Sequence, residues 1–161
     1  MLEAFQITHL HDGDETLAVV LTFEERQKSR HRTLTSCGKT LGWFVERGRV
    51  LQQDDVLKCK DGTLIKVIAA AEDVSNVVAP SPLLLMRAAY HLGNRHVPLQ
   101  VEQNFLRYQQ DHVLDAMVEG LGLTVEHAQL PFHPENGAYS GGHSHAHAHS
   151  HSHAEAHTHE H

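Results

Sequence analysis

The end of the chain is dominated by histidine, whose imidazole can bind metal ions. Residues 143–161 read HSHAHAHSHSHAEAHTHEH, and nine of these nineteen residues are histidine. The others are Ser, Ala, Thr and Glu, which cannot bury enough apolar surface to offset the entropy cost of ordering, so we expect disorder without metal. Alternate histidines on an extended chain can fold back and offer several imidazoles to one ion. The predicted metal ligands here are His143, His145, His147, His149, His151, His153, His157, His159 and His161.

This pattern predicts metal binding without fixing the metal. Imidazole suits Ni(II), Zn(II), Cu(II) and Co(II), and by intrinsic affinity Cu(II) would bind tightest. Because an imidazole must be neutral to bind a metal, binding should weaken as the pH falls through roughly 6 to 7. An engineered tag is the alternative interpretation, but tags are usually unbroken histidine runs, whereas these histidines are interleaved with other residues.

His96 is the first candidate ligand outside that segment. It follows a predicted helix and precedes a predicted strand, in the run Gly93-Asn94-Arg95-His96-Val97-Pro98. Gly93 turns the chain and Pro98 stiffens the exit, so the imidazole should be fixed in position yet exposed. A capping or surface histidine is the alternative. His91 is left open, and the remaining histidines are interpreted as ordinary surface residues: His9, His11, His31, His127 and His133.

His112 is the second candidate ligand. It lies one residue after Asp111, the probable N-cap of a helix, where the positive helix end disfavours imidazolium and keeps the ring neutral. Asp115 lies three residues further along the same helix face, so it could accept a hydrogen bond from the other ring nitrogen and orient the ligand. An ordinary helix-start histidine remains the alternative.

The first half of the chain has the pattern of a small all-β module. Short apolar, β-branched runs alternate with turn residues. Asp61-Gly62 between two such runs is a strong hairpin signal. The polar stretch Glu24–Arg32 is interpreted as a loop. The predicted strands are Thr16–Phe23, Thr33–Thr35, Leu41–Val45, Val50–Leu51, Val56–Lys60 and Thr63–Ala70.

The second half predicts a β-α-β-β-α-β order over residues 64 to 131. Ser81-Pro82 opens a helix that Gly93-Asn94 ends as a left-handed cap, and a second helix runs from the Asp111 cap to about Leu121. This order is the ferredoxin-like split βαβ arrangement. The fold class is therefore α+β, divided into a β-rich module (1–70), a ferredoxin-like domain (71–134) and a disordered histidine-rich tail (135–161). The strands predicted between the helices and after them are Val97–Glu102, Phe105–Gln109 and Leu123–Leu130.

Composition and the absence of certain motifs exclude several classes of function. The formal charge of −7 disfavours nucleic acid as a partner. No apolar run is long enough to span a membrane, no signal peptide is recognisable, and Cys37 and Cys59 are interpreted as reduced thiols, so we expect a cytoplasmic protein. No Gly-rich phosphate loop, nucleophile motif or H-E-x-x-H is present, so no enzyme activity is expected. A basic cluster is either a solvated loop or a patch that docks an acidic partner: Arg26, Lys28, Arg30, His31 and Arg32.

Several of these motifs together resemble one family over nearly the whole chain. They are GNRHVPLQ at Gly93–Gln100, the helix SPLLLMRAAYHL before it, TFEERQKSRHR at Thr22–Arg32, and the histidine-rich end. This combination resembles the UreE family, the urease accessory nickel chaperones. The resemblance implies a partner-binding N-terminal module, a ferredoxin-like metal-binding domain and a variable tail. It also implies a homodimer in which two copies of His96 meet across the two-fold axis and bind one nickel ion.

The function that the resemblance implies is delivery of Ni(II) to a nucleotide-driven assembly complex that activates apo-urease. Some relatives carry a second histidine two positions before the one matching His112. Here that position is Gln110, so an auxiliary site on this helix should be weaker. Two thin cores also favour a homodimer, because small domains bury a smaller share of their surface. The alternatives are a histidine-rich storage or detoxification buffer, and a peptide-binding folding helper with incidental metal affinity.

Overall fold

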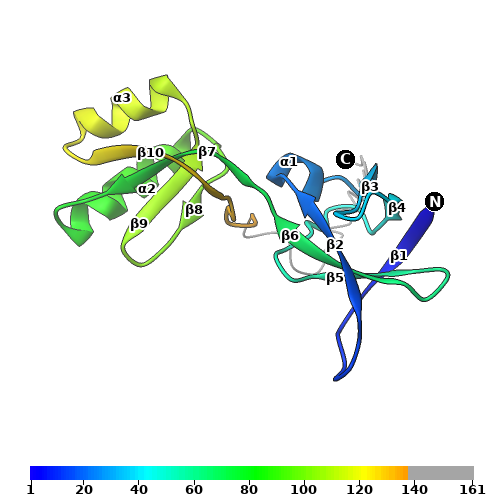
Figure 1. Cartoon of the computed structure of the whole chain (residues 1–161). Coiled ribbons are helices and arrows are strands. Elements are labelled where there is room, and N and C mark those ends of the chain that lie inside the picture. The colour runs from blue at the N-terminus through cyan, green and yellow to red at the C-terminus, as the bar shows by residue number, and fades with distance from the viewer. Residues whose placement is uncertain (138–161) are drawn as a thin grey trace, which may run out of the picture.

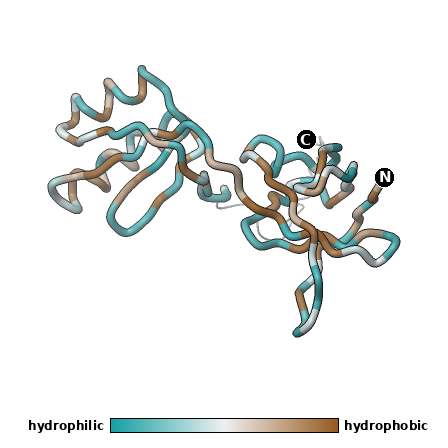
Figure 2. Tube along the Cα trace, viewed as in Figure 1, coloured by the Kyte–Doolittle hydropathy of each residue, from teal (hydrophilic) through white to brown (hydrophobic). Residues whose placement is uncertain are grey.

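The computed structural model of the protein describes residues 1–137, which form two sheets, each with its own core (Figure 1). The fold class is α+β, as predicted. A curled, six-stranded N-terminal sheet is followed by a four-stranded sheet with two helices. Figure 2 shows hydrophobic residues concentrated along the strands and hydrophilic residues in many of the turns. No helix within residues 1–137 is long and apolar enough to cross a membrane.

The N-terminal sheet has the strand order β2-β6-β5-β1-β4-β3. Its β1–β4 and β2–β6 pairs are parallel, and its other pairs are antiparallel. The concave face buries an apolar core that includes Trp43, Leu57 and Ile65, all with no exposed surface. The strands are β1 (Leu2–Thr8), β2 (Thr16–Leu21), β3 (Arg30–Leu34), β4 (Thr40–Phe44), β5 (Val56–Cys59) and β6 (Leu64–Ala69).

Three features of this sheet differ from the sequence interpretation. Val50–Leu51, predicted as a strand, forms none. Strand β1 had not been predicted, although it lies in the middle of the sheet. The stretch Glu24–Arg32 is not a loop, because it contains most of the short helix α1 (Phe23–Arg26) and the start of β3. Thr22 caps α1 in a capping box with Glu25, which is why β2 ends at Leu21 instead of Phe23.

The C-terminal sheet has the strand order β10-β7-β9-β8, with every pair antiparallel. Along the chain the elements follow as β7-α2-β8-β9-α3-β10, which is the predicted ferredoxin-like arrangement. A second core lies between the helices and this sheet and includes Leu92, Leu106 and Val118. The elements are β7 (Ala71–Val78), α2 (Pro82–Asn94), β8 (Gln100–Val101), β9 (Phe105–Gln109), α3 (His112–Gly120) and β10 (Thr124–Pro131).

Helix α2 begins as predicted but ends differently. The Ser81 side chain accepts a hydrogen bond from the Leu84 backbone N–H, and Pro82 occupies the first turn. The predicted left-handed cap at Gly93-Asn94 is wrong, because both residues are still helical and the left-handed conformation falls on His96, at φ 57°. The strand predicted from Val97 is accordingly short and begins only at Gln100.

A buried arginine joins the two halves of the chain. Arg26, at the end of α1, has no exposed surface, and its guanidinium donates to the carbonyl oxygens of Leu51 and Phe132. The rings of Phe23 and Phe132 pack edge to face beside it, at 5.4 Å between centroids. The backbone N–H of Phe23 donates to the Glu72 carboxylate at 2.8 Å. Arg26 is therefore not part of an exposed basic patch, as the sequence had suggested; it fixes α1 against the C-terminal sheet.

Candidate functional site

The His96 corner is exposed, and its backbone conformation is unusual. His96 lies two residues beyond the end of α2 and adopts the left-handed region, which L-residues other than Asn, Asp and His seldom occupy. The turn is held by hydrogen bonds from the N–H groups of Arg95 and His96 to the carbonyls of Leu92 and Gly93. Buried Leu92 and Leu99 anchor the chain on either side of it. The backbone is thus fixed while His96 remains exposed to solvent.

His112 occupies the first position of α3, as predicted. Asp111 is the N-cap, and its side chain accepts hydrogen bonds from the N–H groups of Val113 and Leu114. His112 is exposed. The predicted orienting role of Asp115 toward His112 is wrong, because that carboxylate is buried and hydrogen-bonded to other residues.

The segments that carry the two candidate ligands border one cavity. Val97 and Pro98, directly after His96, line one side of a cavity of about 280 Å³. Gln110 and Asp111, directly before His112, line the other side. The fold therefore brings the neighbours of both histidines together, although they are sixteen positions apart in the sequence. Within residues 1–137, however, no three His, Cys, Asp or Glu side chains lie close enough together to hold a metal ion.

Asp115 is the centre of a polar network that sequence reasoning missed. One of its carboxylate oxygens accepts hydrogen bonds from the Ser75 hydroxyl at 2.7 Å and the Tyr108 hydroxyl at 2.6 Å. The other oxygen lies 2.6 Å from Nε2 of His127. Burial opposes ionisation of Asp115, but the hydrogen bonds from these three partners outweigh it and lower the pKa of the carboxyl group.

This network shows that His127 is not a partnerless surface histidine. Its ring joins β10 to α3 through Asp115. One signal in the sequence could have revealed the arrangement: Asp115 lies in the apolar stripe of α3 beside Leu114 and Val118, and a carboxylate on a buried face needs partners. The strands that supply those partners could not be known without the sheet order.

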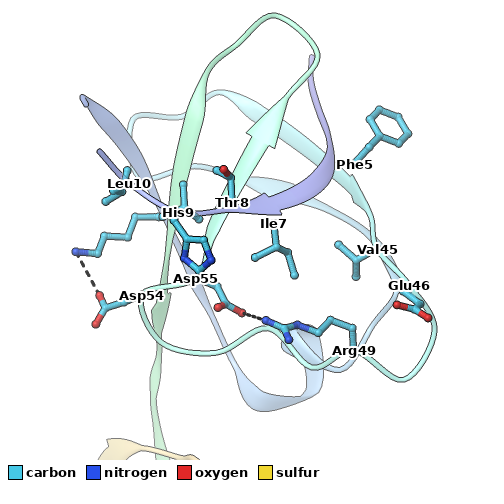
Figure 3. A pocket seen from close by; sticks show the side chains of 12 residues that line it. Phe5, Ile7, Thr8, His9, Leu10, Val45, Glu46, Arg49, Asp54 and Asp55 are labelled. Atoms are coloured by element: carbon cyan, nitrogen blue, oxygen red, sulfur yellow. Dashed lines mark hydrogen bonds and ion pairs between the residues drawn. The ribbon is translucent and has the colours of Figure 1, made fainter. Parts of the chain in front are cut away.

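A larger cavity lies in the N-terminal sheet. It measures about 650 Å³ and opens between β1 and the segment from Val45 to Val56. Figure 3 shows Ile7 and Val45 beside it, with Arg49 and Asp55 joined by a hydrogen bond. Among residues 1–137, one histidine, His9, lines it. Because neither His96 nor His112 lines this cavity, it is not the candidate metal site.

Residues 133–135 bring the chain back toward the segment that follows His96. The backbone N–H of Glu135 donates to the Leu99 carbonyl at 2.8 Å, three residues after His96. The backbone N–H of His133 donates to the side chain of Gln100. Burial and the nearby Arg26 and Arg107 charges lower the pKa of His133. The nine predicted ligands from His143 to His161 lie outside the described residues.

The fold and the exposed histidine corner define a class: a two-part α+β protein with a curled β-sheet and a ferredoxin-like domain. Two family models match the sequence. The model for the UreE urease accessory protein, N-terminal domain, covers residues 5–70, and that for the UreE urease accessory protein, C-terminal domain, covers residues 72–161.

Curated relatives match along most of their length. The urease accessory protein UreE of Teredinibacter turnerae is 57% identical over 148 residues, which is 89% of this chain and 95% of the relative. The protein of the same name from Saccharophagus degradans is 57% identical over 144 residues, covering 88% of this chain and 86% of the relative. The chain belongs to the UreE family of urease accessory proteins, whose members are chaperones of urease maturation.

Proposed function

We propose that the protein is a nickel metallochaperone that carries Ni(II) as cargo. In this proposal a homodimer binds one ion between the two copies of His96 and passes it to the nucleotide-driven assembly proteins that activate apo-urease. The observation that carries the proposal is the His96 corner, where an exposed imidazole stands on a hydrogen-bonded turn and residues 1–137 contain no cluster of three or more ligand side chains. A carrier needs few and exchangeable ligands, in contrast to a closed structural site.

An apolar stripe on α2 supports a homodimer. Leu83, Met86 and Tyr90 are 52%, 62% and 71% exposed, and their spacing places them along one side of the helix. The helix leads directly into the His96 turn. A two-fold axis beside this stripe would bury it against its own copy and bring two His96 imidazoles together, because an isologous interface pairs identical residues near the axis.

The position of Glu135 supports a collecting role for the tail. Glu135 is hydrogen-bonded to Leu99, and His143 follows it by eight positions. An extended chain spans at most about 3.5 Å per residue, so His143 can lie anywhere within roughly 28 Å of Glu135. Tethered imidazoles in that volume would raise the local ion concentration near His96. The tail alone would not select nickel, so Zn(II), Cu(II) and Co(II) are competitors.

His112 enters the proposal as an auxiliary ligand. It is exposed at the start of α3, and residues adjacent to it and to His96 border the same cavity. Gln110 stands where some relatives carry a further histidine, so this auxiliary site should be weaker than the His96 pair. His91, exposed on α2, is left as an alternative ligand.

The three parts of the chain have different roles in this proposal. Residues 1–70 bind a protein partner, residues 71–134 bind the metal ion, and residues 135–161 gather ions. The partners are urease assembly proteins and apo-urease, in the cytoplasm, without nucleic acid or membrane. The carrier role does not include catalysis.

Metal stoichiometry tests this proposal. Nickel binding would be measured by calorimetry on the full chain and on residues 1–142, each with His96 and with His96→Ala. We expect the shortened protein to retain about one ion per dimer and to lose it on His96→Ala. His9→Ala, which removes an exposed histidine from the N-terminal sheet, is the matched control and should leave that ion bound.

Two outcomes would replace the proposal. If removing residues 143–161 abolished all binding and His96→Ala changed nothing further, the protein would be a storage or detoxification buffer. If urease activation at limiting nickel were unaffected by His96→Ala, the delivery role would be abandoned. A folding helper would instead keep both partner binding and urease activation after both changes.

A further inference from the structure

The convex face of the N-terminal sheet carries an aromatic and cationic row that the proposed metal site does not use. The rings of Phe5 on β1 and Phe44 on β4 are stacked, with centroids 5.1 Å apart and planes 4° from parallel. The Lys60 ammonium lies 4.6 Å from the Phe5 ring, and the Arg30 guanidinium lies 4.8 Å from the Phe44 ring. The row therefore crosses the sheet from the end of β5 to β3, in the order Lys60, Phe5, Phe44, Arg30. We call these four residues the cationic row.

The backbone is shaped to present Phe5 on this face. The β1–β5 register shifts between Ala4 and Gln6, which is a β-bulge centred on Phe5. A bulge re-aims a side chain and bends the strand. Ala4 remains in the core with no exposed surface, whereas Phe5 is 42% exposed. The exposed ring is thus a consequence of the strand geometry.

Three cations on this face meet one carboxylate, that of Glu3, whose pKa is lowered by Lys60 and also by the Arg32 charge. Arg30 and Arg32 alternate on the same side of edge strand β3, and neither lies within ion-pair distance of a carboxylate in the range 1–137. Lys60 pairs with Glu3 at 2.9 Å. The rest of the predicted basic cluster is engaged elsewhere: Arg26 is buried, Lys28 pairs with Glu24, and His31 lies 3.5 Å from Glu25. The sequence cluster therefore reduces to Arg30 and Arg32, joined by Lys60 from across the sheet.

The stacked rings add to this preference for negative charge. The face of an aromatic ring is negative and its edge is positive. The outer face of each ring in the row is covered by a cation, so the ring edges are left to meet solvent or a partner. Positively polarised edges beside two unpaired guanidinium groups favour carboxylates. Leu34, 61% exposed at the end of the same edge strand, adds an apolar contact.

Gly42 lies on β4 beside Phe44 and pairs with Arg32 on one side and Glu3 on the other. It is buried, although a Cβ atom there would meet only backbone oxygens, of His31 at 3.8 Å and of Leu2 at 4.0 Å. The surface offered to a partner is therefore made of the cationic row and Arg32.

We propose that this face, made of the cationic row with Arg32, docks an acidic segment of a partner protein that carries Asp and Glu beside an apolar residue. This proposal rests on the proposed carrier role in one respect, because a carrier must bind a partner protein. None of the predicted metal ligands belongs to the docking face. Nucleic acid fits less well, because its affinity comes from many phosphate contacts and this chain has a net charge of −7. Charge complementarity at such a surface governs both the partner chosen and the association rate.

The test uses the full chain and three labelled probes, with binding followed by fluorescence anisotropy. One probe is a ten-residue peptide of Asp and Glu with a central Phe, the second has Asn and Gln in place of the acidic residues, and the third is a single-stranded oligonucleotide. We expect the acidic peptide alone to bind, with affinity that falls as salt increases. The double variant R30E/R32E should weaken this binding by about tenfold or more, since two attractive contacts become repulsive.

Control variants separate this surface from general electrostatics. K39E/R47E changes the net charge equally at exposed positions off the row, and it should weaken binding by less than about threefold. The fold of each variant is checked by circular dichroism and thermal unfolding.

Three results would overturn the proposal: no binding of the acidic peptide, an equal loss in K39E/R47E, or tighter binding of the oligonucleotide than of the peptide. Nickel stoichiometry measured on R30E/R32E keeps this inference apart from the carrier role. We expect that stoichiometry to be unchanged. The docking proposal could then fail without affecting the nickel proposal, and the nickel proposal could fail without affecting the docking proposal.

Discussion

The junction around Arg26 and the corner around His96 show opposite uses of a charged or polar side chain. Arg26 is completely buried, donates to carbonyls from two distant segments, and is covered by Phe23 and Phe132. His96 is exposed at a left-handed backbone position, and residues 1–137 contain no cluster of three or more His, Cys, Asp or Glu side chains that could hold a metal ion. The first arrangement favours rigidity, while the second keeps an imidazole free for exchange.

The residues that stabilise the fold therefore differ from those that are candidates for metal binding. Removing a buried hydrogen-bonding group leaves cavities and unpaired carbonyls, so the junction should be sensitive to substitution. Removing an exposed side chain from a turn costs little stability, so the His96 corner should tolerate change while losing its chemistry. Substitutions can test this contrast, beginning with the largest expected change in the free energy of unfolding.

Arg26→Ala should destabilise the protein most. The change leaves the carbonyl oxygens of Leu51 and Phe132 without their donor and opens a cavity beside Phe23, so we expect a loss of about 2–4 kcal/mol in the free energy of unfolding. Urea denaturation followed by circular dichroism measures it. Arg47→Ala, at an exposed loop position, is the control and should change stability by less than about 0.5 kcal/mol. Equal effects of the two variants would contradict the role of the junction.

The Asp115 network should give a smaller, pH-dependent loss. Asp115→Asn removes the charge that Ser75, Tyr108 and His127 stabilise, and we expect a loss of about 1–3 kcal/mol at neutral pH. Because the pKa of Asp115 is lowered in the fold, its stabilising contribution is present above the ordinary value of 3.8 and is lost as the pH falls through the lower folded value.

Unfolding of the wild type and of Asp115→Asn between pH 7 and pH 2 checks this sign. The variant should show a shallower loss of stability than the wild type below about pH 4. Asp12→Asn, in an exposed turn, serves as the matched control and should follow the wild-type curve. Parallel curves for the wild type and Asp115→Asn would mean that the network does not stabilise the ionised carboxylate.

Most of the fold could be predicted from local signals. The Ser81 and Asp111 caps, the Asp61-Gly62 turn and the helical spacing of apolar residues are properties of short segments, and the structure confirms them. The central strand β1 was missed because its pairing partners are distant in the sequence: β4 and β5 lie more than thirty residues away. Arg26 was misread for the same reason, since Phe132 closes over it from the other end of the chain.

Local signals likewise predicted some features of the candidate site, while features that depend on long-range packing were missed. The exposure of His96 and the helix-start position of His112 follow from local sequence, and both are found in the structure. The left-handed conformation of His96 could not be foreseen, because Gly93 offered a better local candidate for it and tertiary packing of Leu92 and Leu99 decided otherwise. The roles of His96, His112 and the tail histidines as ligands stay predictions.

His96→Gly should have the smallest effect on stability and the clearest effect on chemistry. A glycine at φ 57° relieves the strain that an L-residue bears there, but it adds entropy to the unfolded chain, so we expect stability to change by at most about 1 kcal/mol. His96→Ala, which keeps the strain, should be the less stable of the two variants, and both should lose the shared nickel ion equally. Thermal unfolding and nickel calorimetry on the same samples measure both effects. If His96→Gly unfolded as readily as Arg26→Ala, the corner would be a structural element, and the contrast with the junction would fail.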